Sequence, residues 1–194
     1  MTLAEIQKLD AGYNWTNDNG KTFPFRGKDV TVPTLREVFE AFPDSIINIE
    51  SKHSDPSPVN QLCGLIKEFK RTDKTIVAST IKKFLNDFRQ SCEGVATSAS
   101  PSEAIGFLAR YKLNLEDNYT PAMQSLQVIK GIGSWQFVTK GYVKAAHEKN
   151  VEVHVWTINK TEDMQNLIDA GVDGIMTDYP DRLLKIVNEN YDPK

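Results

Sequence analysis

Long hydrophobic runs are absent from this 194-residue sequence. No stretch approaches the roughly 18 consecutive apolar residues that a bilayer-spanning helix needs. The first ten residues carry Glu5, Lys8 and Asp10, so they lack the apolar centre of a secretory signal. We therefore expect a soluble protein with no membrane span, and the sequence leaves open whether it is cytoplasmic or secreted.

A strong excess of one charge is absent as well. Lys and Arg together number 23, Asp and Glu 26, and the formal net charge is −3. Surfaces that bind nucleic acids need clustered positive charge to neutralise phosphates. The totals therefore argue against a nucleic acid partner.

Cysteine is scarce, with Cys63 and Cys92 as the two in the chain. Each falls in a segment with helical apolar spacing, where a small buried thiol is a common occupant. The sequence predicts two inert thiols rather than a disulfide.

The chain is long enough for one substantial core and too short for two ordinary domains, which predicts a single domain over residues 1–194. Short β-branched runs alternate with segments of helical spacing, the pattern of repeated βα units. The predicted strands are Ile46–Glu50, Thr75–Ser79, Val95–Ser98, Ser125–Ile129, Val151–Thr157 and Val172–Thr177.

Six strands joined by helical crossovers fit either an open doubly wound sheet or most of an eight-stranded barrel. No glycine-rich loop of the dinucleotide-binding kind follows any predicted strand. Polar or chemically active residues instead stand at several strand ends, on the face that carries function in barrels. Both features favour the barrel. The strand-end residues are Glu50, Lys52, Trp156, Asn159, Thr177 and Asp178.

Helix ends are marked in the sequence. Thr34 with Glu37, and Ser100 with Glu103, have the spacing of a capping box, in which each residue satisfies a free backbone N–H of the other. Gly171 follows an apolar stripe and predicts a left-handed residue that ends a helix.

The segment from residue 12 to residue 33 is long for a connection and contains Trp15, Phe23, Phe25 and Arg26. It predicts an ordered loop anchored by aromatic side chains. Such a loop either forms part of a substrate mouth or is a surface loop held by its aromatics.

Glu50 and Lys52 stand two residues apart at the end of a predicted strand, so both side chains lie on one face. A carboxylate there suits a hard divalent cation, and a lysine beside it suits a phosphate oxygen. The alternative is an ordinary ion pair at a strand end.

Three histidines are available for acid–base chemistry. His53 follows Lys52 in a loop, which is typical of a solvated side chain. His147 lies in a predicted helix and is expected to pack or to face solvent. His154 shares a strand face with Trp156, so it either points into a barrel lumen or is a hydrogen-bonded core residue, and we favour the core residue.

Trp156 stands near a strand end, where a large flat side chain walls a pocket for a small polar or acyl-bearing substrate or packs in the core. Asp178 precedes Tyr179 and Pro180. That position is typical of a cap or turn, so a structural role is favoured over metal ligation.

Several motifs resemble those of glycerophosphodiester phosphodiesterases. The longest lies within Val153–Pro180 and reads Val-Trp-Thr-Ile-Asn, then Asp-Ala-Gly-Val-Asp-Gly-Ile-Met-Thr-Asp-Tyr-Pro. The likeness extends to Val-Pro-Thr-Leu-Arg-Glu-Val at 32–38, to Asn-Ile-Glu-Ser-Lys at 48–52, and to Thr2–Gly12, which ends in Leu-Asp-Ala-Gly. Nearly the whole chain is covered.

The resemblance implies a (β/α)₈ barrel of TIM type that hydrolyses glycerophosphodiesters to glycerol 3-phosphate and an alcohol with a divalent cation, Ca²⁺ or Mg²⁺. Glu50 matches the family's third carboxylate ligand to the metal. Lys52 matches its phosphate-side lysine, and Trp156 matches an aromatic at the mouth of the substrate pocket.

The family's opening strand ends in His-Arg and is followed by Glu-Asn-Thr, a Glu-x-Asp metal pair and a His-Asp, and none of these occurs here. The resemblance therefore implies an incomplete barrel lacking its first two strands, in an N-terminally truncated domain. Without those histidines the chain is expected to be inactive. A fragment of a longer protein is favoured over a second polypeptide that completes the barrel or self-association through open sheet edges.

Two other functions are compatible with the sequence. One is a non-catalytic module that binds a phosphate ester or a protein on a partial barrel. The other is a TIM-barrel enzyme of different chemistry that uses His53 or His154.

Overall fold

A computed structural model describes the chain except for residues 54, 56, 116–117 and 191–194. Contacts within the chain divide it into two compact units, Met1–Ser45 and Ile46–Lys194. Within the described ranges, no helix combines the length and apolar character needed to cross a bilayer.

The first unit contains two short helices, α1 (Leu3–Ile6) and α2 (Leu35–Ala41). Both begin with capping boxes. At α2 the Thr34 N–H donates to the Glu37 carboxylate at 2.6 Å, and the Glu37 N–H donates to Thr34 Oγ1 at 3.2 Å. The capping box predicted at Thr34 is confirmed.

Aromatic contacts hold the long connection between these two helices. The Arg26 guanidinium lies 4.2 Å from the ring centroid of Tyr13 and 3.9 Å from that of Phe23. Trp15 and Phe25 pack edge to face with centroids 4.8 Å apart. The expected aromatic anchors of this loop are present. Whether the loop forms part of a substrate mouth stays a prediction.

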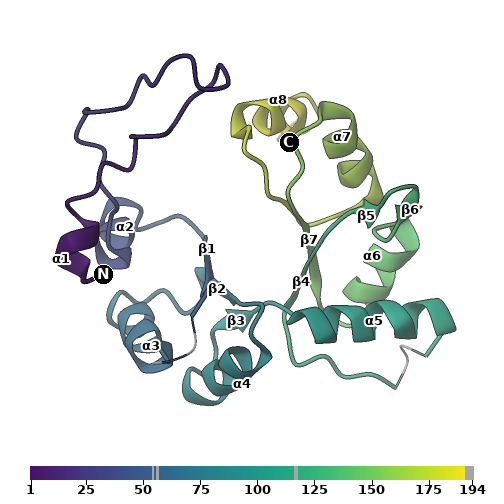
Figure 1. The fold of residues 1–194 in the computed structure, drawn as a ribbon. Coiled ribbons are helices and arrows are strands. Elements are labelled where there is room, and N and C mark those ends of the chain that lie inside the picture. Colours follow the sequence, from purple (N-terminus) through teal and green to yellow (C-terminus); the bar gives the residue numbers. More distant parts are fainter. Residues whose placement is uncertain (54, 56, 116–117, 191–194) are drawn as a thin grey trace. The chain divides into compact units, whose positions relative to one another are not determined.

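The second unit alternates parallel strands with helices (Figure 1). All six predicted strands are present, each of them shorter than predicted. They are β1 (Ile47–Glu50), β2 (Thr75–Ala78), β3 (Ala96–Thr97), β4 (Ser125–Val128), β7 (Glu152–Val155) and β8 (Gly174–Ile175). The helices are α3 (Val59–Glu68), α4 (Lys82–Ser91), α5 (Pro101–Leu113), α6 (Lys140–His147), α7 (Thr161–Ala170) and α8 (Pro180–Asn190).

The six strands pair in chain order. One sheet runs β1-β2-β3 and another runs β4-β7-β8, all parallel, and a bridge between Ser98 and Ser125 joins the two. Among the described residues, β1 pairs with β2 alone and β8 with β7 alone, so the strands do not close into a ring. The predicted α/β fold is confirmed, and the barrel that lacks two strands stays a prediction.

A short hairpin interrupts the alternation and was not predicted. It consists of β5 (Gly131–Ile132) and β6 (Trp135–Gln136), which pair antiparallel. Gly133 at the turn has a φ of 58°, a left-handed value that glycine adopts without steric cost.

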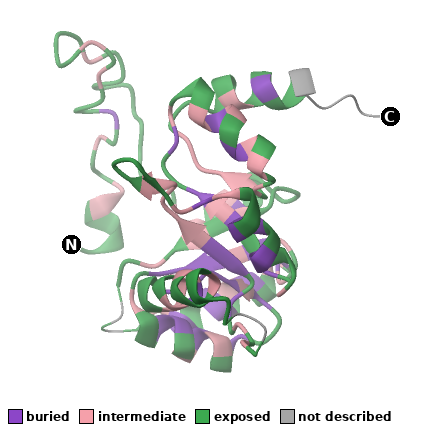
Figure 2. Cartoon of the chain, turned by 90° about the vertical axis from the view of Figure 1, so that its right-hand side faces the viewer, coloured by how far each residue is buried: buried purple, intermediate pink, exposed green. Residues whose placement is uncertain are grey.

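Buried side chains are concentrated on the strands and on the helix faces that cover them (Figure 2). The main apolar cluster involves β4, β7 and the helices α5 to α8, and includes Phe107, Leu126, Val153 and Met164, all fully buried. Gly171 ends α7 in the left-handed conformation, with φ 87°, as predicted.

The prediction of two inert thiols is wrong. Cys63 on α3 and Cys92 at the end of α4 form a disulfide, with their Cα atoms 5.6 Å apart. Helices α3 and α4 are neighbours on the same part of the sheet, which brings both buried sulfurs together. Helical spacing correctly indicates burial, but it carries no information about a partner 29 residues away.

Candidate functional site

A pocket of about 800 Å³ lies in the second unit at the carboxyl ends of its parallel strands. Every one of the six strands is followed by a residue that lines this pocket. These residues are Lys52 after β1, Ser79 and Thr80 after β2, Ser98 and Ala99 after β3, Ile129 after β4, Trp156 and Thr157 after β7, and Met176 after β8. This is the face where parallel α/β folds place their ligands.

Glu50 and Lys52 both line the pocket, as the two-residue spacing predicts. Glu50 ends β1 and its carboxylate accepts from the Lys52 ammonium at 2.6 Å. Both side chains are exposed, so the pair contributes little to stability. The lysine is therefore free to exchange its carboxylate partner for another anion at small cost.

Hydrogen bonds fix the strand ends around this pair. Ser79 Oγ donates to the Ser51 carbonyl at 2.7 Å, which ties the end of β2 to the end of β1. Asn48 on β1 and Gln127 on β4 exchange amide hydrogen bonds of 3.0 and 3.3 Å. Both amides line the pocket, so its floor is polar where β1 faces β4.

Trp156 follows β7 and lines the pocket with 45% of its surface exposed. Its backbone N–H donates to the Val128 carbonyl at 3.1 Å, so the residue is held by strand pairing. Of the two alternatives for this side chain, the pocket wall fits the structure and core packing does not.

Asn159 ties together the loops that follow β7 and β8. Its Oδ1 accepts from Thr177 Oγ1 at 3.1 Å and from the Asp178 N–H at 3.0 Å, and its Nδ2 donates to the Asp178 carboxylate at 2.8 Å. The structural role favoured for Asp178 agrees with these contacts.

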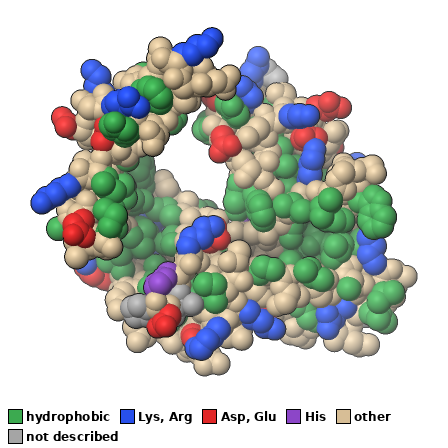
Figure 3. All heavy atoms as spheres, in the orientation of Figure 1, with side chains coloured by type: hydrophobic (Ala, Val, Ile, Leu, Met, Phe, Trp, Pro, Cys, Tyr) green, Lys and Arg blue, Asp and Glu red, His purple; other side chains and the backbone are tan. Residues whose placement is uncertain are grey.

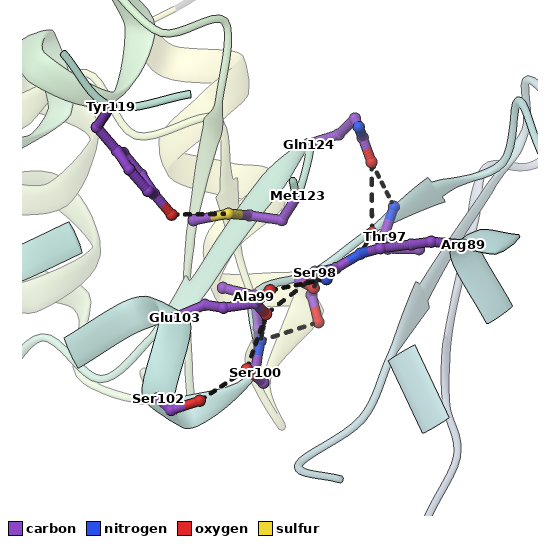
Figure 4. A network of polar contacts seen from close by, with 10 residues as sticks. All are labelled: Arg89, Thr97, Ser98, Ala99, Ser100, Ser102, Glu103, Tyr119, Met123 and Gln124. Carbon is purple, nitrogen blue, oxygen red and sulfur yellow. Dashed lines mark hydrogen bonds and ion pairs between the residues drawn. The ribbon is translucent and has the colours of Figure 1, made fainter. Parts of the chain in front are cut away.

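The wall at residues 98–101 contacts a part-buried polar network (Figure 4). The Arg89 guanidinium donates to Glu103 at 2.7 Å, to Thr97 Oγ1 at 2.9 Å and to the Ser98 carbonyl at 2.9 Å. Glu103 accepts in addition from the Ser100 N–H at 2.7 Å, which is the backbone half of the predicted capping box. Burial tends to raise the pKa of Glu103, but Arg89 and Ser100 together hold that pKa below its ordinary value.

The described residues that line the pocket include no histidine. His147 pairs with Asp173 at 2.8 Å, and His154 pairs with Glu152 at 3.1 Å, which fits a hydrogen-bonded residue rather than one pointing into a lumen. An enzyme that uses His53 or His154 in this pocket is therefore not supported. Tyr142 also lines the pocket, and burial raises its pKa, so the phenol stays protonated at neutral pH.

Sequence reasoning missed the apolar side of the pocket. Ile105 and Leu108 on α5, with Ile132 and Phe137 in and after the hairpin, line that side. The hairpin has a sequence signal, because Gly133 and Ser134 form a two-residue connection between short apolar runs.

A model of the family described as the Glycerophosphoryl diester phosphodiesterase family matches residues 1–182. The chain belongs to this family. The match crosses both compact units, so the family's pattern is continuous through the boundary at residue 45.

Known members of the family resemble the chain in sequence and in fold. A glycerophosphodiester phosphodiesterase from Caldanaerobacter subterraneus subsp. tengcongensis is 30% identical over 97% of this chain and 72% of that protein. The solved phosphodiesterase domain of a Mycobacterium tuberculosis protein has a TM-score of 0.80 at 17% identity, over 98% of this chain and 75% of that one. A phosphodiesterase from Oleispira antarctica, solved with sn-glycerol 3-phosphate, has a TM-score of 0.64 at 18% identity. The match covers 97% of this chain and 71% of that one.

A divalent cation is implied by the resemblance to this family. Among the residues that the structure describes, no three His, Cys, Asp or Glu side chains are grouped so that they would hold a metal ion. Glu50 is the one carboxylate among the described lining residues, and it already pairs with Lys52. Since Ca²⁺ takes six to eight oxygen ligands, the described residues of this chain do not form a complete cation site.

Proposed function

We propose that the pocket is a phosphodiester site and serves the hydrolysis of glycerophosphodiesters to glycerol 3-phosphate and an alcohol. The observation that carries the proposal is the Glu50–Lys52 pair, which lines one pocket with Trp156 at the carboxyl ends of the strands. The solved relative that holds sn-glycerol 3-phosphate supports the same class of ligand.

Each of the three residues has a proposed role. Lys52 donates to a phosphate oxygen and neutralises its charge, which makes it both a substrate contact and a catalytic residue. Trp156 forms an apolar wall against the substrate. Glu50 is one ligand of a divalent cation, Ca²⁺ or Mg²⁺, although no three His, Cys, Asp or Glu side chains of the described residues are grouped to hold one.

We propose that the 194-residue chain alone does not turn substrate over. A general acid or base typically contributes 10²–10⁴-fold to a rate, and no histidine or second carboxylate is among the described lining residues. The test is a glycerophosphocholine assay of the purified chain with Ca²⁺ and with Mg²⁺, beside a Lys52→Ala variant. We expect no hydrolysis above the variant's background, and metal-dependent hydrolysis that requires Lys52 would contradict the proposal.

A non-catalytic binding module is the second candidate function. It is favoured by the same observation, since the described residues of the pocket offer a lysine and an apolar wall but no histidine. In calorimetry, saturable binding of glycerol 3-phosphate without turnover would support it. Absence of binding would count against both candidates.

We further propose that the two units belong to one domain over residues 1–194, in which the six strands occupy part of a (β/α)₈ barrel. The family match across the unit boundary supports this. Among the described residues the outer edges of β1 and β8 have no strand partner, and copies of the chain would self-associate through the backbone groups on these edges. Sedimentation equilibrium tests the self-association, because a monomer at all concentrations would rule out such pairing.

A further inference from the structure

The two sheets of the second unit contribute different residues to the pocket. Glu50 and Lys52 stand at the end of β1 in the first sheet, and Trp156 follows β7 in the second. Hydrophobic side chains gather over the region of α5 and the β5–β6 hairpin in Figure 3, and α5 contacts β4 of the second sheet. A ligand that contacts the charged pair and the tryptophan together therefore bridges the two sheets.

Backbone hydrogen bonds join the two sheets at the seam between β3 and β4. There Ser98 and Ser125 form a bridge, and the Ala99 N–H donates to the Ser125 carbonyl at 2.8 Å. The order β1-β2-β3 places β1 at the opposite end of its sheet from this seam. Because neighbouring strands lie about 4.8 Å apart, a small rotation at the seam acts on β1 over a lever arm of about 10 Å and moves the charged pair relative to Trp156.

A pair of side-chain amides links the two sheets at a second place. Gln127 Nε2 on β4 donates to Asn48 Oδ1 on β1 at 3.0 Å, and Asn48 Nδ2 donates to Gln127 Oε1 at 3.3 Å. Both side chains line the pocket. Since β1 and β4 do not pair in the part of the chain that the structure describes, these two hydrogen bonds connect strands that the sheet ladders leave separate.

Each amide lies next to a residue of the candidate site. On β1 the side-chain period of two puts Asn48 on the same strand face as Glu50, and both line the pocket. On β4 Gln127 precedes Val128, whose carbonyl accepts the Trp156 N–H at 3.1 Å. The amide pair therefore joins the strand that carries the charged pair to the strand that anchors the tryptophan.

We propose that Asn48 and Gln127 are positioning residues, which set the spacing between Lys52 and Trp156 for a phosphate ester that contacts both. This rests on the proposed phosphodiester site and adds two residues that act through Lys52 and Trp156 rather than by contact with the ligand. Loss of either amide breaks both hydrogen bonds and releases the spacing. The fraction of chains with the correct spacing then falls, and the apparent affinity falls by the same factor.

The test is calorimetry with two ligands. Glycerophosphocholine carries groups on both sides of its phosphate and contacts both sheets, whereas inorganic phosphate offers a partner to Lys52 alone. Asn48→Leu and Gln127→Met keep the size of each side chain and remove the hydrogen bonds. We expect each variant to weaken the binding of glycerophosphocholine by roughly 5- to 30-fold, the effect of two neutral hydrogen bonds, and to leave the binding of phosphate unchanged.

Further variants separate positioning from direct contact with the ligand. The double variant Asn48→Leu/Gln127→Met should bind no more weakly than either single variant, because the second substitution removes a group whose partner is already lost. The exchanged pair Asn48→Gln/Gln127→Asn keeps both amides and the same number of methylenes, so it should recover most of the affinity. Gln165→Met is the control, since it removes an exposed amide hydrogen bond to Asp169 on α7, outside the described lining, and should bind like the natural chain.

Four results would overturn the proposal. Additive losses in the double variant mean that each amide contacts the ligand by itself. Equal losses for phosphate and glycerophosphocholine mean that the amide pair supports the fold in general. Unchanged affinity for glycerophosphocholine in both single variants refutes the positioning role, and it leaves the phosphodiester site standing when Lys52→Ala weakens binding. No binding of either ligand to the natural chain removes both proposals.

Discussion

The guanidinium of Arg89 and the carboxylate of Glu103 form an ion pair in which Nη1 lies 2.7 Å from Oε1, with the two side chains only 16% and 13% exposed. The pair joins α4 to the first turn of α5 directly behind the pocket wall. Removal of one partner leaves the other charge buried without compensation.

Arg89→Met is therefore expected to lower the free energy of unfolding by about 2–3 kcal/mol, at or below the low end of the range for a broken buried pair, because both side chains keep some contact with solvent. Urea unfolding followed by circular dichroism measures the change. Lys83→Met is the control, because Lys83 pairs with Asp87 on the same helix at an exposed position and should change stability by less than about 1 kcal/mol. Equal effects of the two substitutions would contradict a special role for the buried pair.

The same pair predicts a dependence of stability on pH. The pKa of Glu103 is lowered in the folded chain relative to its ordinary value of 4.5, so its contribution is complete above that value and is lost as the pH falls through the lowered pKa. The difference in unfolding free energy between the natural chain and Glu103→Gln should be constant near neutral pH and shrink on acidification. A difference that grows toward low pH would mean that folding raises the pKa of Glu103, which contradicts the prediction.

Reduction of the Cys63–Cys92 disulfide is expected to destabilise the second unit. The bond closes a loop with a sequence separation of 29, for which the chain-entropy model gives about 3–4 kcal/mol. Urea unfolding with and without a thiol reductant measures this, and the Cys63→Ala/Cys92→Ala variant should show no response to the reductant. Two alkylatable thiols in the chain unfolded without reductant would show that the bond is absent.

Gly174 on β8 lies against the ring of His154 on β7. A Cβ at residue 174 would stand 2.8 Å from His154 Cδ2, closer than side chains approach each other. Gly174→Ala is expected to cost about 1–3 kcal/mol of stability through overpacking. The same substitution combined with His154→Ala should cost less than the sum of the two single changes. Additive effects would show that the loss of stability in Gly174→Ala does not come from contact with His154.

Much of the fold follows from local sequence patterns. The β-branched runs place all six parallel strands, and the capping residues mark the starts of α2 and α5. Strands and helix starts depend on residues that are close together in the chain. The spacing of apolar residues and the capping side chains are enough to predict them. The disulfide and the Arg89–Glu103 pair depend on which helices become neighbours, and no local pattern carries that information.

Part of the candidate site was likewise predictable from the sequence and part was not. Because strand ends meet at one face of a parallel sheet, the sequence predicts that Glu50, Lys52 and Trp156 lie close together, and all three line the pocket. Their roles toward metal, phosphate and substrate stay a prediction. The apolar side was missed because the spacing of Ile105 and Leu108 is that of an ordinary helical stripe. In the structure Leu108 packs against the core cluster, while Ile105 lines the pocket with 67% of its surface exposed.

We propose that Lys52 holds a phosphate ester beside Glu50 and Trp156. Titration of glycerol 3-phosphate into the full chain, followed by calorimetry, measures this binding, with Lys52→Ala compared with Lys83→Ala. The two lysines are matched, since their side chains are 75% and 80% exposed and each pairs with a carboxylate at 2.6 Å.

A charge-assisted hydrogen bond contributes about 1.5–3 kcal/mol, so Lys52→Ala should weaken binding by roughly 10- to 150-fold while Lys83→Ala leaves it unchanged. Equal affinity in the natural chain and Lys52→Ala would contradict the claim.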